Sequence, residues 1–196
     1  MLNRNTFFIR EQIEFLKLKG TYEILDPETK TLIGVAKEKP SIIIQLLKFL
    51  VDKRFLPTKI FIYETNSLED ESKLLFSMQK GITLLNAKVQ ILDKTGNVIG
   101  WLQSKFFSLG GAFRVFDSFG TETYLVKGDW KGWNFKFQDM NQNEVGTITK
   151  KWAGAGKELF TSADNYIISL NQTSDSKKTI LLLAAGLAVD IVYKEK

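Results

Sequence analysis

The chain contains no cysteine and no histidine. Without cysteine it has no disulfide, no thiolate nucleophile and no thiolate metal site. Without histidine it has no Ser-His-Asp triad, no imidazole general base and no histidine-ligated zinc or haem. Carboxylate or lysine chemistry and oxygen-ligated Ca²⁺ or Mg²⁺ are the options that remain. These absences favour a protein that is not an enzyme, and no cofactor is expected.

The N-terminal residues also lack the pattern of a secretory signal. Arg4, Arg10 and Glu11 interrupt the apolar residues, and no cleavage site of small residues follows. The absence of cysteine fits a reducing compartment. We therefore expect a cytoplasmic protein, with peripheral attachment to a membrane as a further option.

Length and composition predict one globular domain over residues 1–196, with residues 1–20 as a lead-in. The chain has 196 residues, of which 44% are hydrophobic and 25% charged, so it can bury a core without staples. The formal net charge of +5 permits binding to anionic lipid or nucleic acid. The alternative is a lysine-rich surface that serves solubility alone.

Aspartate-led turns divide most of the chain into short alternating segments. The turns begin at Asp26, Asp93, Asp117 and Asp139, and residues 135–138 alternate between phenylalanine and polar residues. This layout predicts a meander of antiparallel hairpins. Closure removes the exposed edges of so long a meander, so we predict a mainly β protein with a closed antiparallel barrel.

Two segments depart from the β pattern. Ser41 could cap a short helix near residues 41–52, although residues 42–44 would also suit a strand. The C-terminal run is predicted to be a helix over residues 178–193. Its apolar part would span about 21 Å, against roughly 30 Å for a bilayer core, and Asp190 interrupts it. A buried central helix is therefore favoured over a membrane span, and a buried Asp190 would need a polar partner.

The C-terminal third of the sequence resembles the LURP-one-related and phospholipid scramblase family. The resemblance rests on Lys150–Trp152, on Phe160–Tyr166 and on the terminal apolar run with Asp190. Upstream, residues 22–38, 56–64 and 128–139 follow the same order and spacing. The resemblance implies the tubby-like fold, a closed antiparallel barrel of about a dozen strands around one hydrophobic C-terminal helix.

The resemblance also bears on metal binding and membrane anchoring. The Ca²⁺-binding segment of scramblases aligns with Ser162–Thr173, where Asp164 and Asn165 are retained but Ser162 and Thr173 stand in place of carboxylates. Ca²⁺ favours several oxygen ligands, often charged, so no metal site is expected. The family's proline- and cysteine-rich N-terminal extension and palmitoylation site have no counterpart in this sequence, which favours the LURP-one-related branch.

Lysines lie close to tryptophans in the last third of the sequence. This pairing suits an anionic lipid interface, because the ammonium meets phosphate and the indole sits at headgroup depth. Single-stranded nucleic acid would suit it too, but is the less favoured ligand. The alternative is that the tryptophans pack the barrel and the lysines solubilise it. The candidate lipid-binding residues are Lys127, Lys131, Trp133, Lys150, Lys151, Trp152 and Lys157.

These observations favour a non-enzymatic binding module for anionic phospholipid or for a protein at a membrane surface. One alternative is a phospholipid scramblase, whose C-terminal helix would have to enter the bilayer. The other is an intracellular scaffold for protein interactions.

Overall fold

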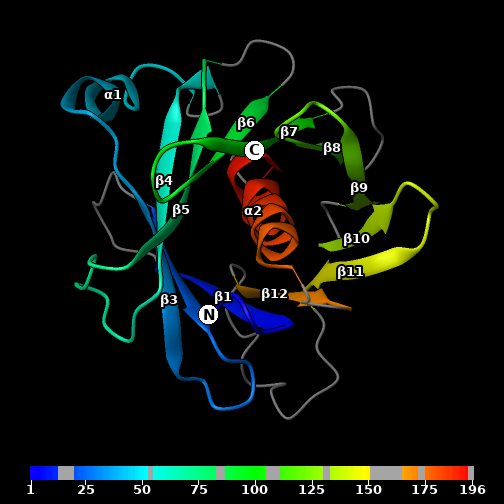
Figure 1. The fold of residues 1–196 in the computed structure, drawn as a ribbon. Coiled ribbons are helices and arrows are strands. Elements are labelled where there is room, and N and C mark those ends of the chain that lie inside the picture. The colour runs from blue at the N-terminus through cyan, green and yellow to red at the C-terminus, as the bar shows by residue number, and fades with distance from the viewer. Residues whose placement is uncertain are drawn as a thin grey trace.

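Twelve strands form one closed antiparallel barrel in the computed structural model, as predicted (Figure 1). The structure describes residues 1–12, 20–52, 55–82, 87–104, 111–129, 133–150, 165–171 and 175–193. Neighbouring strands follow chain order, and β1 closes the barrel by pairing with both β2 and β12. The strands are β1 (Thr6–Gln12), β2 (Thr21–Leu25), β3 (Leu32–Glu38), β4 (Thr58–Tyr63), β5 (Leu74–Lys80), β6 (Lys88–Asp93), β7 (Val98–Ser104), β8 (Ala112–Asp117), β9 (Glu122–Asp129), β10 (Asn134–Asp139), β11 (Glu144–Thr149) and β12 (Asn165–Leu170).

Helix α2 (Ser176–Tyr193) runs through the ring of strands, as predicted for the C-terminal run (Figure 1). It begins two residues earlier than expected, and every residue from Thr179 to Ile191 is buried. Strands surround the helix, so all of its faces can be apolar without contacting lipid. In the described part of the chain, no helix combines the length and hydropathy needed to cross a bilayer.

The short helix α1 (Ile42–Leu47) stands outside the ring of strands, between β3 and β4 (Figure 1). The Ser41 Oγ accepts a hydrogen bond from the Ile44 N–H at 3.4 Å, which confirms the predicted cap. Residues 48–50 continue as turns, so the helix is shorter than the predicted range of 41–52. The alternative of a strand over residues 42–44 was wrong.

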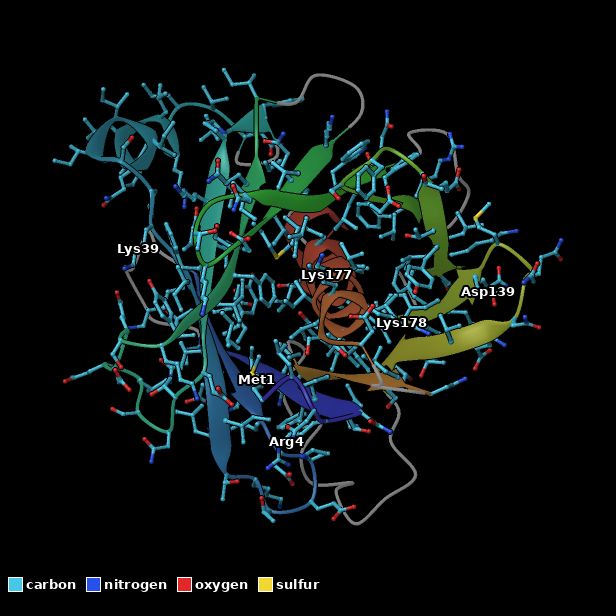
Figure 2. All side chains as sticks on the ribbon, in the orientation of Figure 1. Met1, Arg4, Lys39, Asp139, Lys177 and Lys178 are labelled. Carbon is cyan, nitrogen blue, oxygen red and sulfur yellow. The ribbon has the colours of Figure 1, made fainter. Side chains whose placement is uncertain are left out.

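The two ends of the barrel differ in construction. The odd-numbered strands end at one rim, here called the loop rim, with Gln12, Glu38, Lys80, Ser104, Asp129 and Thr149. The opposite rim, here called the turn rim, carries the hairpin turns. Helix α2 starts at the turn rim, where the Lys178 Nζ lies 5.8 Å from the centroid of the Tyr124 ring. Figure 2 shows Lys177 and Lys178 together at this end of the helix.

Three hairpin turns at the turn rim repeat one hydrogen-bond pattern. The Asp93 Oδ1 accepts backbone N–H bonds from Thr95 at 2.8 Å and from Asn97 at 2.9 Å. Asp117 and Asp139 accept the equivalent pairs of N–H bonds two and four residues further on. These bonds satisfy turn amides and confirm the predicted aspartate-led turns. Bonds from the Thr95 hydroxyl and the Asn97 N–H lower the pKa of Asp93 to about 2.

Gln142 occupies a position at which the two equivalent turns have glycine. Its φ is +66°, against +90° at Gly96 and +89° at Gly120. A side chain in this left-handed conformation is strained, so Gln142→Gly should raise the free energy of unfolding by about 0.5 kcal/mol, net of the greater freedom of glycine in the unfolded chain. Urea denaturation measures the change. Asn141→Gly, one residue earlier, serves as the control and should lower stability; equal effects of both changes would contradict the strain.

Gly100 on β7 allows α2 to approach the barrel wall. A Cβ atom there would lie 2.4 Å from the Phe116 backbone oxygen and 2.6 Å from the Leu181 Cδ2. Gly100→Ala should therefore destabilise the protein by about 1–3 kcal/mol, because a backbone atom cannot move aside cheaply. Gly81→Ala is the matched control, since nothing lies within 4 Å of its added Cβ. Thermal melts should separate the two variants, and similar melting temperatures would refute the close fit.

Candidate functional site

Three of the seven predicted lipid-binding residues are described, and all three lie where β9, β10 and β11 meet the loop rim. Lys127 is near the end of β9, Trp133 precedes β10, and Lys150 follows β11. The other four predicted residues, Lys131, Lys151, Trp152 and Lys157, lie outside the described residues.

Lys150 and Trp133 contact one another directly. The Lys150 Nζ lies 4.5 Å from the centroid of the Trp133 ring, a cation–π contact. The Lys150 N–H also donates to the Trp133 backbone oxygen at 3.3 Å. Both residues are half-buried at the end of the barrel. Their contact places the lysine ammonium beside an aromatic ring at the loop rim.

The Trp133 indole also belongs to the packing of the barrel. Its ring centroid lies 5.1 Å from that of Tyr166 on β12, with the planes tilted by 32°. Trp133 packs against the main hydrophobic core, in which Tyr166 is fully buried. Trp133 therefore both packs the barrel, as one interpretation predicted, and contacts a lysine at the rim, as the lipid-binding interpretation predicted. It connects the Lys150 ammonium to the barrel interior.

Lys127 lies on the outer face of the wall. It is exposed and stands opposite Lys136 of β10 in the strand register. The Lys136 Nζ forms an ion pair with Glu144 at 2.8 Å, whereas Lys127 makes no ion pair with a described residue. Like charges on directly opposed residues repel. An anion that binds Lys127 would relieve that repulsion.

A buried polar cluster lies inside the barrel behind Trp133. Asp190 of α2 is 2% exposed and interacts with the hydroxyl of Tyr22 on β2. Tyr166 and Glu11 are close enough to add electrostatic effects. Asp190 was predicted from the sequence to need a polar partner, whereas the part played by the two tyrosines and Glu11 was not predicted. No local pattern marks them, because only barrel closure brings β1, β2 and β12 side by side.

Burial and negative charge both oppose ionisation of these tyrosines. Desolvation raises the pKa of Tyr22 well above 10, and the charge of Asp190 raises it further. Burial likewise raises the pKa of Tyr166, followed by the charges of Asp190 and Glu11. The Tyr166 hydroxyl has no hydrogen-bond partner among the described residues, whereas a side-chain hydrogen bond with Asp190 is among the causes that raise the pKa of Tyr22.

The two tyrosines should therefore respond differently to the loss of the hydroxyl. Tyr22→Phe removes a group that interacts with Asp190 and should cost about 1 kcal/mol, whereas Tyr166→Phe should leave stability unchanged or raise it. Since the folded-state pKa values exceed those of the unfolded chain, the unfolded state releases protons first above about pH 10. Stability should be full below that pH and fall as pH rises above it.

Urea denaturation at pH 7 and at pH 10.5 tests both statements. Either Phe variant should lose less stability than the parent protein between the two pH values. Equal losses for Tyr22→Phe and Tyr166→Phe at pH 7 would contradict the difference between the hydroxyls.

The described part of the segment that the resemblance aligns with Ca²⁺ binding belongs to the barrel wall. Its described portion includes β12, in which Tyr166, Ile167 and Ile168 are fully buried. Ser162, Asp164 and Thr173 lie outside the described residues. Among the residues the structure describes, no group of three or more acidic side chains is placed to hold a metal ion.

The fold is thus a barrel that encloses its own C-terminal helix and carries a lysine–tryptophan pair at one rim. The family model described as Scramblase matches residues 70–196, which is more than half of the chain. The chain therefore belongs to the scramblase family, in agreement with the resemblance noted from its motifs. Family membership indicates a role related to phospholipids.

Two curated relatives align with a shorter stretch. Phospholipid scramblase 1 of Mus musculus is 31% identical over 64 residues, which cover 32% of this chain and 20% of the mouse protein. Phospholipid scramblase 1 of Rattus norvegicus is 31% identical over 64 residues, which cover 19% of the rat protein. The match thus spans about a fifth of the length of each relative. No solved structure matches the chain.

Proposed function

We propose that this chain is a non-enzymatic module that binds anionic phospholipid at a membrane surface as a peripheral protein. The observation that supports it most is the contact between the Lys150 ammonium and the Trp133 indole at the loop rim. An ammonium can bind a lipid phosphate while the adjacent indole lies at headgroup depth. Lys127, which is exposed, adds a second cation on the next strand but one.

The residue types of the chain favour binding over catalysis. It contains neither histidine nor cysteine, the commonest general base and the most nucleophilic side chain. The scramblase family supports the choice of phospholipid as the ligand.

The burial of α2 favours surface binding over lipid scrambling. Its residues from Thr179 to Ile191 are buried within the barrel, and Asp190 interacts with Tyr22 there. For α2 to enter a bilayer, the barrel would have to open and Asp190 would have to leave its polar surroundings, which is costly. Surface binding requires neither change.

Sedimentation with vesicles tests the proposal. The purified chain should bind vesicles that contain phosphatidylserine or phosphoinositide more tightly than neutral phosphatidylcholine vesicles, and physiological salt should weaken the binding. The double variant Lys127→Gln/Lys150→Gln should bind about 30-fold more weakly, because each lysine near an anionic surface contributes roughly 1 kcal/mol.

Lys94→Gln/Lys177→Gln is the matched control, since it removes the same charge from exposed positions at the turn rim. It should bind nearly as well as the parent chain. Equal weakening by both double variants would mean that net charge alone governs binding. No binding to any vesicle would refute the proposal and favour a scaffold for protein interactions.

A further inference from the structure

The segment that follows β3 exposes an unusual concentration of large apolar side chains. Helix α1 has no buried residue, and five apolar side chains of residues 42–50 are 62% to 83% exposed. Single exposed apolar residues are common on proteins, but a contiguous group marks a surface that contacts another apolar phase. These residues, here called the apolar finger, are Ile42, Ile43, Leu46, Phe49 and Leu50.

The only charged side chain of residues 42–50, that of Lys48, points inward. The Lys48 Nζ donates to both carboxylate oxygens of Glu38 at 2.8 Å, and the two side chains are only 7% and 11% exposed. Glu38 also accepts the Gly20 N–H at 3.1 Å, which fixes it at the end of β3. An ordinary surface helix buries its apolar residues and exposes its charges. Here the arrangement is inverted, and an ion pair attaches the segment to the barrel with its apolar residues outward.

The surroundings of the apolar finger are basic. Residues 38–59 contain five basic and two acidic residues, and ion pairs join Lys48 to Glu38 and Lys39 to Glu71. The Lys59 Nζ lies 5.0 Å from the centroid of the Phe61 ring, and the Lys39 Nζ lies 5.3 Å from it. In Figure 2, Lys39 lies below α1 at the left of the view, away from Lys177 and Lys178 at the turn-rim end of α2. Exposed apolar side chains among cations complement a bilayer with anionic headgroups.

The position of the finger on the barrel is also compatible with contact to a bilayer. Both the finger and the Lys150–Trp133 pair lie at the loop rim, and five strands lie between β3 and β9 in either direction around the ring. Ile82, which follows β5 at the same rim, is another apolar residue that is 78% exposed. A flat surface placed against the loop rim could therefore meet the finger on one side and the lysine–tryptophan pair on the other.

We propose that the apolar finger inserts into the interfacial layer of an anionic bilayer and seats the barrel on the membrane by its loop rim. This inference rests on the proposed function and adds the orientation and the inserting element. The lysines supply attraction to anionic headgroups, and the finger supplies the apolar contact that salt does not screen.

Site-specific labelling can test insertion because the chain has no cysteine of its own. Leu50→Cys carries an environment-sensitive fluorophore in the finger, and Phe119→Cys carries it in the β8–β9 turn at the opposite rim, where Phe119 is 92% exposed. With vesicles of phosphatidylcholine and phosphatidylserine, the label at position 50 should shift to the blue and be quenched by spin-labelled lipid. The label at position 119 should do neither.

Substitution of the finger provides the second measurement. Phe49→Ser/Leu50→Ser should lower binding to these vesicles by about tenfold or more and leave a larger share of the remaining binding sensitive to salt. Phe119→Ser, with an equally exposed apolar side chain at the turn rim, should bind like the parent chain. Because all three side chains are exposed, the thermal melts of these variants should match that of the parent.

The outcomes separate this inference from the proposed function. Binding by the parent chain with a water-exposed label at position 50 and no effect of Phe49→Ser/Leu50→Ser overturns insertion and leaves the lipid-binding function standing. Absence of binding to any vesicle overturns both. If the label at position 50 becomes shielded as protein concentration rises without vesicles, and sedimentation shows a dimer that the double variant abolishes, the finger is an interface between two copies and insertion is wrong.

Discussion

The burial of α2 inside the barrel is the interaction on which the rest of the structure depends. A ring of twelve strands is too wide for its own side chains alone to fill, and the helix provides much of the apolar core. Glycines allow the helix and the wall to pack closely. A Cβ atom would lie 2.6 Å from the Leu181 Cδ2 at Gly100 of the wall, and 2.3 Å from the Ile168 Cδ1 at Gly186 of the helix. The helix is in turn apolar on every face because strands surround it.

The loop rim collects the features that suggest function. It carries the lysine–tryptophan pair, the apolar finger and, just inside, the polar cluster of Tyr22, Tyr166 and Asp190. Trp133 contacts Tyr166, and the charge of Asp190 raises the pKa of Tyr166. The Lys150–Trp133 pair and the end of α2 are therefore parts of one packed unit. The core itself therefore positions Trp133 and, through it, Lys150 at this rim.

Local signals were sufficient to predict the architecture. The aspartate-led turns depend on bonds between residues two and four apart, so Asp93, Asp117 and Asp139 could be recognised from short segments. The buried helix followed from a length too short for a bilayer and from Asp190 within it. Tyr22 and Tyr166 could not be predicted, because their proximity requires β1 to pair on both sides. The apolar finger could not be predicted either, because its outward orientation depends on the ion pair between Lys48 and Glu38, which the local sequence does not reveal.

The pairing of β1 with β12 has a consequence for the order of folding. The register joins Phe8 to Ile167, so the first strand finds one of its two partners only after most of the chain has been made. The helix that fills the barrel is the last element to follow. On the ribosome, the strands of the growing chain therefore form before the helix that fills the barrel, and β1 has one edge exposed until β12 has been made. Such contacts between distant residues fold slowly and leave apolar surface exposed in the meantime. Completion of the barrel and completion of the core thus both depend on the consecutive elements β12 and α2.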